Sequence, residues 1–228
     1  MPRSPLTRVS EFLQPPALYL LGSLALVFAV PLRATLGDEV SRLLTCIAFN
    51  AILYAFSRTT LPLRARPRAT ALGAVLGALV AFPSAFGGSF TPITAVAAIL
   101  VVIDASWEEV LFRGLAFDFT LRRYGPWGAL ALSSVWFASA HLFDAATHNL
   151  VTFSYLVLAG VVMGAIRVVS GSLWPAITFH AAHNLLLSCS TVDDTHWGSL
   201  AAVGVAAAAL LVRVRAVPAP DTGTSETP

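Results

Sequence analysis

The stretch Ile103–Gly114 reads Ile-Asp-Ala-Ser-Trp-Glu-Glu-Val-Leu-Phe-Arg-Gly and places the charged residues Glu108, Glu109 and Arg113 inside an apolar segment. The surrounding segment Pro92–Leu121 has the length and hydrophobicity of a membrane-spanning helix. A charge at the centre of a bilayer costs about 2.5–3.5 kcal/mol on insertion scales, so these side chains are expected to line a polar interior. The stretch therefore predicts a helix bundle with a functional site at the depth of the membrane.

The composition of the whole chain agrees with this reading. Its 228 residues are 57% hydrophobic and 11% charged, and the mean hydropathy is +0.76. Soluble domains carry about 25% charged residues, so the soluble, disordered and disulfide-stabilised classes are excluded. The basic residues are all arginines scattered between apolar runs, and a net charge of +2 gives no sign of a nucleic-acid partner. Cys46 and Cys189 both lie in apolar runs, which favours two free buried thiols.

Arginines, prolines and polar clusters divide the chain into eight predicted transmembrane helices. The predicted fold class is thus an all-α, polytopic membrane helix bundle. Its spans are Ala17–Leu32, Leu43–Ser57, Ala69–Ala85, Pro92–Leu121, Pro126–Phe143, Leu150–Val168, Leu173–Ser190 and Trp197–Val212. We expect one transmembrane domain at 1–217 with the site-bearing core at 92–190, and a disordered polar tail at 218–228.

The arginines also predict the orientation of these spans. If both termini are cytoplasmic, only Arg33 and Arg42 fall on the opposite side of the membrane. The cytoplasmic side then holds Arg3, Arg8, Arg58, Arg64, Arg66, Arg68, Arg122, Arg123, Arg167, Arg213 and Arg215. The positive-inside rule favours this arrangement, and the compact, lysine-free chain is typical of a bacterial plasma-membrane protein.

Two further patterns predict packing rather than chemistry. The pairs Gly73-x-x-x-Gly77 and Gly160-x-x-x-Gly164 are typical of helices whose backbones approach closely. Asp118 and Arg122 are one helical turn apart toward the predicted cytoplasmic end, where we expect a surface ion pair without a functional role.

The spacing within Ile103–Gly114 separates two kinds of carboxylate. Glu109 and Arg113 are four residues apart on one helical face, so an ion pair between them offsets part of the cost of burial. Glu108 is about 100° further round the helix and free of that pair. Asp104, one turn earlier, shares the face of Glu108.

Two later spans add further polar groups. His141 lies near the end of the fifth span, and His180 and Asn184 of the seventh are one turn apart and project together. His183 is three residues from His180 and is expected in a supporting position. If the bundle brings these helices together, the groups match hydrolysis: a carboxylate base, a histidine that positions water, and a histidine and an amide that stabilise an oxyanion.

The pattern of these residues resembles a known family. Three motifs in order, Glu108-Glu109-x-x-x-Arg113, Phe137-x-x-x-His141 and His180-x-x-x-Asn184, are similar to those of the CPBP (Abi) intramembrane proteases. That family includes the CAAX prenyl endopeptidases and bacteriocin-processing or immunity proteins. The resemblance covers about Asp104 to Ser190.

The resemblance implies a role for each motif residue. Glu108 would be the general base that activates water, with His141 orienting the water or sharing its proton. His180 and Asn184 would stabilise the tetrahedral oxyanion. Glu109 and Arg113 would form a structural ion pair, and Phe137 would pack so as to hold the imidazole of His141; these and His183 are the supporting residues.

A metal is the open point of this interpretation. Glu108, His141 and His180 would be the ligands if zinc were bound, since two histidines and a glutamate are a common zinc set. The signature His-Glu-x-x-His is absent from the sequence, so a metal-free glutamate mechanism with no cofactor is favoured.

Taken together, these patterns predict an intramembrane endopeptidase acting on a hydrophobic peptide or a membrane-protein segment, with the lipid bilayer as its surroundings and no nucleic acid as a partner. A proton-coupled transporter lined by the same ionisable groups is one alternative. A non-proteolytic, peptide-binding immunity protein is another. The sequence has no inverted repeat, which weighs against the transporter. Its three motifs are intact, which weighs against a non-proteolytic immunity protein.

Overall fold

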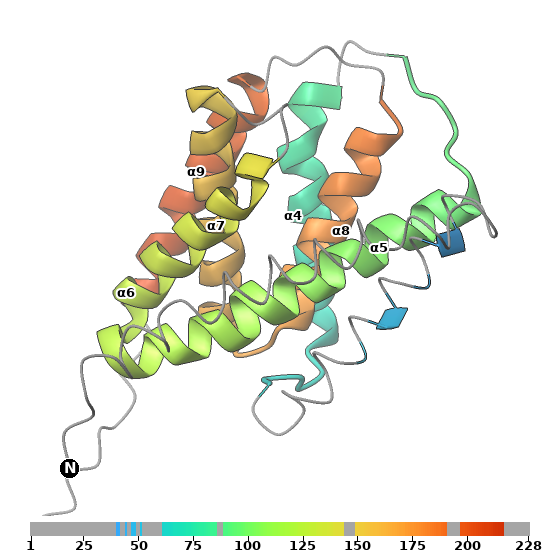
Figure 1. Cartoon of the computed structure of the whole chain (residues 1–228). Helices are drawn as coiled ribbons and strands as arrows, with labels where there is room; N and C mark the ends of the chain where they lie inside the picture. Colours follow the sequence, from blue (N-terminus) through green and yellow to red (C-terminus); the bar gives the residue numbers. More distant parts are fainter. Residues whose placement is uncertain are drawn as a thin grey trace, which may run out of the picture.

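The computed structural model of the chain describes residues 61–85, 89–143, 149–190 and 197–216, with isolated residues between 40 and 51. Within these ranges the regular structure is helical (Figure 1), which confirms the all-α fold class. The elements are α4 (Pro67–Ala85), α5 (Ala95–Glu109), the π-helix η1 (Val110–Ala116), α6 (Phe117–Ala140), the 3₁₀-helix η2 (His141–Phe143), α7 (Leu150–Ser170), α8 (Trp174–Ser188) and α9 (Trp197–Arg215).

Three of these helices, α4, α7 and α9, are long and apolar enough to cross a membrane. They coincide closely with three of the predicted spans, and such helices indicate a membrane protein. The predicted spans Ala17–Leu32 and Leu43–Ser57 lie outside the described ranges, apart from isolated helical residues of the second. The predicted tail at 218–228 also lies outside them.

The predicted span Pro92–Leu121 becomes one long helical rod. It consists of α5, η1 and the first part of α6, and it crosses the other helices obliquely (Figure 1). Thr94 caps its start, because its hydroxyl oxygen accepts a hydrogen bond from the backbone N–H of Ala97 at 3.1 Å. The rod ends at Gly125, where φ is 68°, and Pro126 follows. The break falls between the two spans that the sequence predicts.

The predicted glycine pairs lie where helices meet. A Cβ atom at Gly77 of α4 would lie 2.8 Å from the carbonyl carbon of Phe179 in α8. A Cβ at Gly160 of α7 would lie 2.8 Å from the Cβ of Ser134 in α6. The other member of each pair makes a similarly close approach. These contacts confirm the predicted packing role of the glycines, and those of the α4 pair place α8, which carries several candidate site residues, directly against α4.

The ion pair predicted between Asp118 and Arg122 is wrong. Asp118 pairs instead with Arg167 of α7, whose guanidinium also lies 4.5 Å from the ring centroid of Phe117, while Arg122 is exposed. Helical spacing allows a local pair, but a buried arginine without a counter-charge costs more than an exposed one, so Arg167 takes the carboxylate. The pair joins α6 to α7.

Candidate active site

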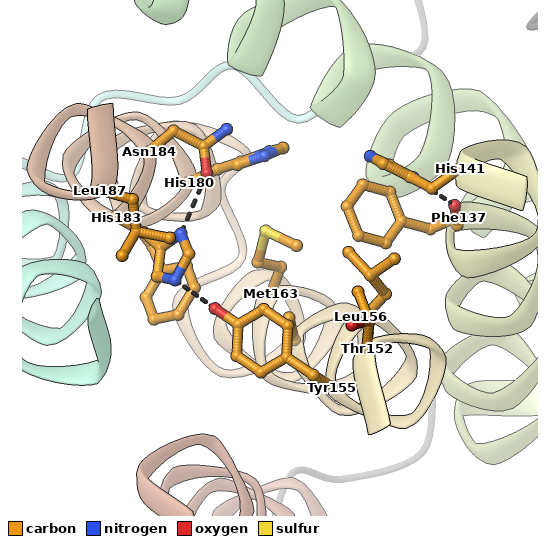
Figure 2. Close-up of a pocket in the computed structure, with 12 residues that line it drawn as sticks. Phe137, His141, Thr152, Tyr155, Leu156, Met163, His180, His183, Asn184 and Leu187 are labelled. Carbon is orange, nitrogen blue, oxygen red and sulfur yellow. Dashed lines mark hydrogen bonds between the residues drawn. The ribbon is translucent and has the colours of Figure 1, made fainter. Parts of the chain in front are cut away.

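A cavity of about 250 Å³ lies among α6, η2, α7 and α8 (Figure 2). Its polar lining comes from His141, Thr152, Tyr155, His180, His183 and Asn184. The rest of its wall is apolar and consists of Phe137, Leu156, Ala159, Met163, Phe179 and Leu187. An apolar cavity with a few convergent polar groups has the character of a ligand-binding site.

Beside this cavity, Glu109 and Arg113 form a pair that is fully buried. The Nη1 atom of Arg113 donates a hydrogen bond to Oε1 of Glu109 at 3.1 Å, and neither side chain is exposed. The ion pair predicted from their spacing is therefore confirmed. Arg113 lies in the π-helix η1, a rare helix type that occurs frequently at functional sites.

An aromatic ring also packs against Arg113. Its guanidinium carbon lies 4.2 Å from the ring centroid of Phe137. Its Nε and Nη2 atoms have no hydrogen-bond partner among the described residues. Glu109 and the aromatic face of Phe137 thus compensate most of the arginine charge.

The same oxygen of Glu109 also holds a residue of a distant helix. Nδ1 of His180, in α8, lies 3.0 Å from Oε1 of Glu109. Because a carboxylate oxygen only accepts, Nδ1 carries the proton and donates it to Glu109. This contact gives Glu109 a task that the sequence did not predict: it orients His180, whose Nε2 atom is directed toward Glu108.

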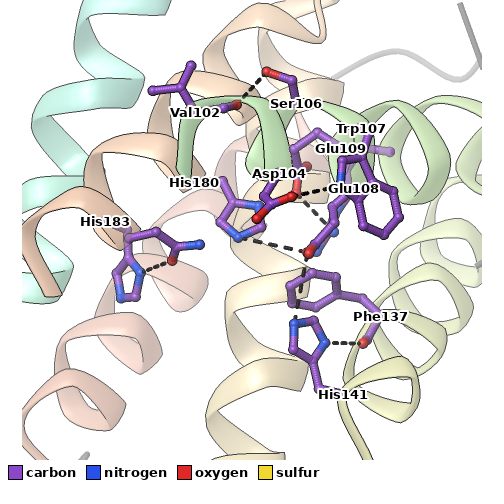
Figure 3. A network of polar contacts seen from close by, with 12 residues as sticks. Val102, Asp104, Ser106, Trp107, Glu108, Glu109, Phe137, His141, His180 and His183 are labelled. Atoms are coloured by element: carbon purple, nitrogen blue, oxygen red, sulfur yellow. Dashed lines mark hydrogen bonds and ion pairs between the residues drawn. The ribbon is translucent and has the colours of Figure 1, made fainter. Parts of the chain in front are cut away.

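Glu108 lies between two imidazoles (Figure 3). Its Oε2 atom is 3.9 Å from Nε2 of His141 and 4.0 Å from Nε2 of His180. Both distances are too long for a hydrogen bond, and within the described part of the chain Oε2 has no hydrogen-bond partner. Each of these gaps is wide enough for a water that bridges Oε2 of Glu108 to an imidazole nitrogen. Glu108 itself is outside the cavity lining and meets it through the two imidazoles.

His141 is oriented by the residue one turn before it. Its Nδ1 atom donates to the carbonyl oxygen of Phe137 at 2.9 Å, which leaves Nε2 toward Glu108. The ring of Phe137 makes edge contacts with His141 and with His180, at centroid distances of 4.7 Å and 5.8 Å. Phe137 therefore packs against both imidazoles, and not only against the one that its motif position implies.

Asn184 lines the cavity together with His180, as their one-turn spacing predicts. Its Oδ1 atom accepts a hydrogen bond from Nδ1 of His183 at 2.9 Å, and Nε2 of His183 is bonded to the hydroxyl of Tyr155 in α7. Sequence reasoning missed Tyr155. The one available signal was a phenol in the middle of an apolar span, where its hydroxyl requires a partner.

The alternative zinc set of Glu108, His141 and His180 does not fit this geometry. Zinc ligand atoms lie about 2.0–2.2 Å from the metal, which places two tetrahedral ligand atoms about 3.4 Å apart. The two Oε2–Nε2 distances, 3.9 Å and 4.0 Å, are longer. In the described ranges, no group of three His, Cys, Asp or Glu residues is close enough to hold a metal ion.

The motif residues all lie in a part of the chain that matches a known family. Residues 89–186 match the family model described as type II CAAX prenyl endopeptidase Rce1-like. This region is therefore similar to the CPBP family, to which that model belongs. The CPBP match extends from before α5 to the last turn of α8, so it covers every candidate site residue and confirms the resemblance carried by the three motifs. No curated protein matches the chain. The family named in this match consists of proteases, which act on peptide or protein substrates.

Proposed function

We propose that this protein is an intramembrane endopeptidase in which Glu108 and His141 activate water for attack on a peptide bond. The observation that carries the proposal is the convergence of Glu108 with the Nε2 atoms of His141 and His180, at 3.9 Å and 4.0 Å. These groups come from three segments that are far apart in the sequence. Each of the two gaps is wide enough for a bridging water, and the family match supports the same chemistry.

In this mechanism Glu108 is the general base. A water between the three groups donates one hydrogen to Oε2 of Glu108 and the other to Nε2 of His141, which orients its lone pair toward the cavity. As the water oxygen attacks the peptide carbonyl carbon, its proton passes to Glu108. The protonated carboxyl group then returns this proton to the departing amine.

His180 and Asn184 stabilise the oxyanion that forms. His180 already donates from Nδ1 to Glu109, so donating from Nε2 as well requires the imidazolium form. Glu109, which also pairs with Arg113, and the oxyanion itself balance the charge of this imidazolium. The amide nitrogen of Asn184 supplies a second donor, and one such donor contributes about 10²–10³ in rate.

The substrate class follows from the cavity wall. Leu156, Met163 and Phe179 form apolar surface beside the imidazoles, which suits an apolar side chain next to the scissile bond. We propose a hydrophobic peptide or a membrane-protein segment as the substrate. The prenylated CAAX tail named in the family description is one member of that class.

We propose the eight-span layout with both termini cytoplasmic as the setting of this site. The three apolar helices α4, α7 and α9 and the arginine distribution support it. Single cysteines placed at each terminus of a cysteine-free variant should react with a membrane-impermeant maleimide only after the cells are opened. Labelling of either terminus in intact cells would contradict this orientation.

The proteolytic function is tested with two internally quenched peptides that end in a CAAX sequence, one farnesylated and one unmodified, and with an unbiased survey of membrane-protein termini. Wild-type enzyme should release new peptide termini, and Glu108→Gln and His141→Gln should lower their rate of formation at least 10²-fold while leaving the protein folded.

Ser106→Ala on the same helix is the control, because the hydroxyl of Ser106 bonds to the carbonyl oxygen of Val102 away from the site (Figure 3). Undiminished cleavage by Glu108→Gln would refute the mechanism. No wild-type-dependent terminus in either assay would refute the function.

We also propose that no metal takes part. Cleavage should then be unchanged after dialysis against 1,10-phenanthroline. A loss of activity that zinc alone restores would refute the metal-free mechanism and leave the protease assignment intact.

A further inference from the structure

A second chain of polar contacts runs along the cavity wall opposite Glu108. It leads from the hydroxyl of Tyr155 in α7 to Nε2 of His183, and from Nδ1 of His183 to Oδ1 of Asn184 at 2.9 Å (Figure 2). Tyr155 is 5% exposed and His183 is 6% exposed. The catalytic steps above use Asn184 but assign no task to the other two residues.

The chemistry of the three groups gives this chain a direction. A carboxamide oxygen only accepts hydrogen bonds, so Nδ1 of His183 must carry a proton to bond Oδ1 of Asn184. A neutral imidazole with a proton on Nδ1 has a lone pair on Nε2, which accepts from the hydroxyl of Tyr155. The amide nitrogen of Asn184 then points away from His183, as Figure 2 shows.

We propose that Tyr155 and His183 are positioning residues that hold Asn184 with its amide nitrogen toward the cavity. The proposal rests on the proposed function, because it explains how one oxyanion donor is kept in place. A carboxamide has similar shape in both orientations, and packing alone discriminates poorly between them. The tautomer of His183 supplies the discrimination, since an Nδ1–H would repel the amide hydrogens of a flipped Asn184.

Two aromatic rings, those of Phe179 and Tyr155, lie beside the imidazole of His183. The ring of Phe179 is nearly parallel to it, with an interplanar angle of 12° and a centroid distance of 6.4 Å. The ring of Tyr155 lies at a centroid distance of 5.7 Å. These contacts and the low exposure restrict rotation of the imidazole, so its protonation pattern becomes the variable that sets the orientation of Asn184.

The same atoms could form the reverse network. Nε2–H of His183 would then donate to the oxygen of Tyr155, and the amide nitrogen of Asn184 would donate to Nδ1, which turns the amide oxygen toward the cavity. An oxygen in that place repels a developing oxyanion. The two networks differ in the tautomer of His183 and, with it, in the orientation of Asn184 and of the Tyr155 hydroxyl, and the tautomer is observable.

The decisive measurement is the tautomer of His183, and it needs no substrate. Imidazole ¹⁵N shifts of histidine-labelled protein in detergent micelles, assigned by single His→Gln substitutions, report which nitrogen carries the proton. We expect Nδ1–H in the wild-type protein, and a mixture of tautomers in Tyr155→Phe. Nε2–H or a doubly protonated ring in the wild-type protein would overturn the proposal. An unchanged Nδ1–H signal in Tyr155→Phe would remove Tyr155 from it.

Kinetics on whichever quenched peptide is cleaved give the second readout. Tyr155→Phe should lower kcat about 10-fold with KM unchanged, because the oxyanion exists only in the transition state. Tyr124→Phe is the matched control, since Tyr124 is 48% exposed and remote from the cavity. His183→Asn keeps a donor near the position of Nδ1 and should retain more activity than His183→Leu.

These outcomes separate the two proposals. If Glu108→Gln is inactive and Tyr155→Phe matches Tyr124→Phe, the positioning role fails and the protease mechanism stands. If Glu108→Gln is fully active, the protease mechanism fails. The tautomer measurement still decides whether Tyr155 and His183 position Asn184. Equal losses in kcat and 1/KM for Tyr155→Phe would indicate a general structural role and would also overturn the proposal.

Discussion

Replacing Gly77 by alanine tests how strongly the contact between α4 and α8 controls the site. The new Cβ would lie 2.8 Å from the carbonyl carbon of Phe179 and 3.0 Å from its Cα. Both are backbone atoms of α8, so no side-chain rotation relieves the overlap. An ordinary contact requires about 3.5–4.0 Å, so the two helices must separate by roughly 1 Å.

The magnitude follows from two opposing terms. Alanine gains about 0.5–1 kcal/mol over glycine within a helix, and overpacking a close contact costs about 1–3 kcal/mol. Gly204 of α9 provides the matched control, because a Cβ added there would meet no other atom of the described residues within 4 Å, and only the favourable term applies. The free energies of unfolding of Gly77→Ala and Gly204→Ala should therefore differ by the steric term alone, about 1–3 kcal/mol.

The same displacement should reach the proposed catalytic groups. His180 follows Phe179 directly, so a shift of α8 by about 1 Å changes the 4.0 Å distance between Nε2 of His180 and Oε2 of Glu108, and a misplacement of this size can lower activity about 10²-fold. Unfolding in mixed micelles with increasing SDS fraction measures stability, and cleavage of the quenched peptides measures activity. Equal stability of the Gly77→Ala and Gly204→Ala variants would refute the close approach of α4 and α8.

Two further predictions concern the buried ion pairs. Glu109→Gln and Arg113→Met each leave one buried group uncompensated and should lower the free energy of unfolding by about 3–5 kcal/mol. The double variant should lose clearly less than the sum of the two single losses. Additive losses in the mixed-micelle assay would contradict the Glu109–Arg113 pair. Asp118→Asn should lower the free energy of unfolding by about 1–3 kcal/mol, because the substitution removes the counter-charge of the buried Arg167. Arg122→Gln, at an exposed position, should change the free energy of unfolding by less than about 0.5 kcal/mol. Equal effects of Asp118→Asn and Arg122→Gln would contradict the pair of Asp118 with Arg167.

Much of the helical organisation could be read from the sequence. Lipid supplies no hydrogen bonds to the backbone, so an apolar run of sufficient length must be helical, and its ends are marked where proline, glycine or arginine interrupts it. The break at Gly125 and Pro126 and the left-handed cap at Gly171 both fall between predicted spans. Charged and imidazole side chains were conspicuous for the same reason, because an ionisable group in an apolar run needs a polar neighbour.

The interaction partners of those side chains could be predicted from the sequence only in part. Helical periodicity predicted the Glu109–Arg113 pair because both residues lie on one helix, and it correctly separated Glu108 from that pair. It also suggested a local partner for Asp118 that the fold replaces with Arg167. The π-helical segment η1 has no counterpart in a pattern based on 3.6 residues per turn.

What the amino-acid sequence determined by itself is therefore most of the described α-helices and the polar groups that they carry. Both follow because lipid cannot solvate an unpaired backbone group or an unpaired charge. The tertiary structure alone decided that Glu109 binds His180, 71 positions along the chain, and that Tyr155 binds His183. Periodicity specifies the face on which a side chain lies, whereas its partner depends on how two helices pack and rotate against each other. Contacts of that kind arise from close-packed side chains of several helices at once, and no single segment encodes them.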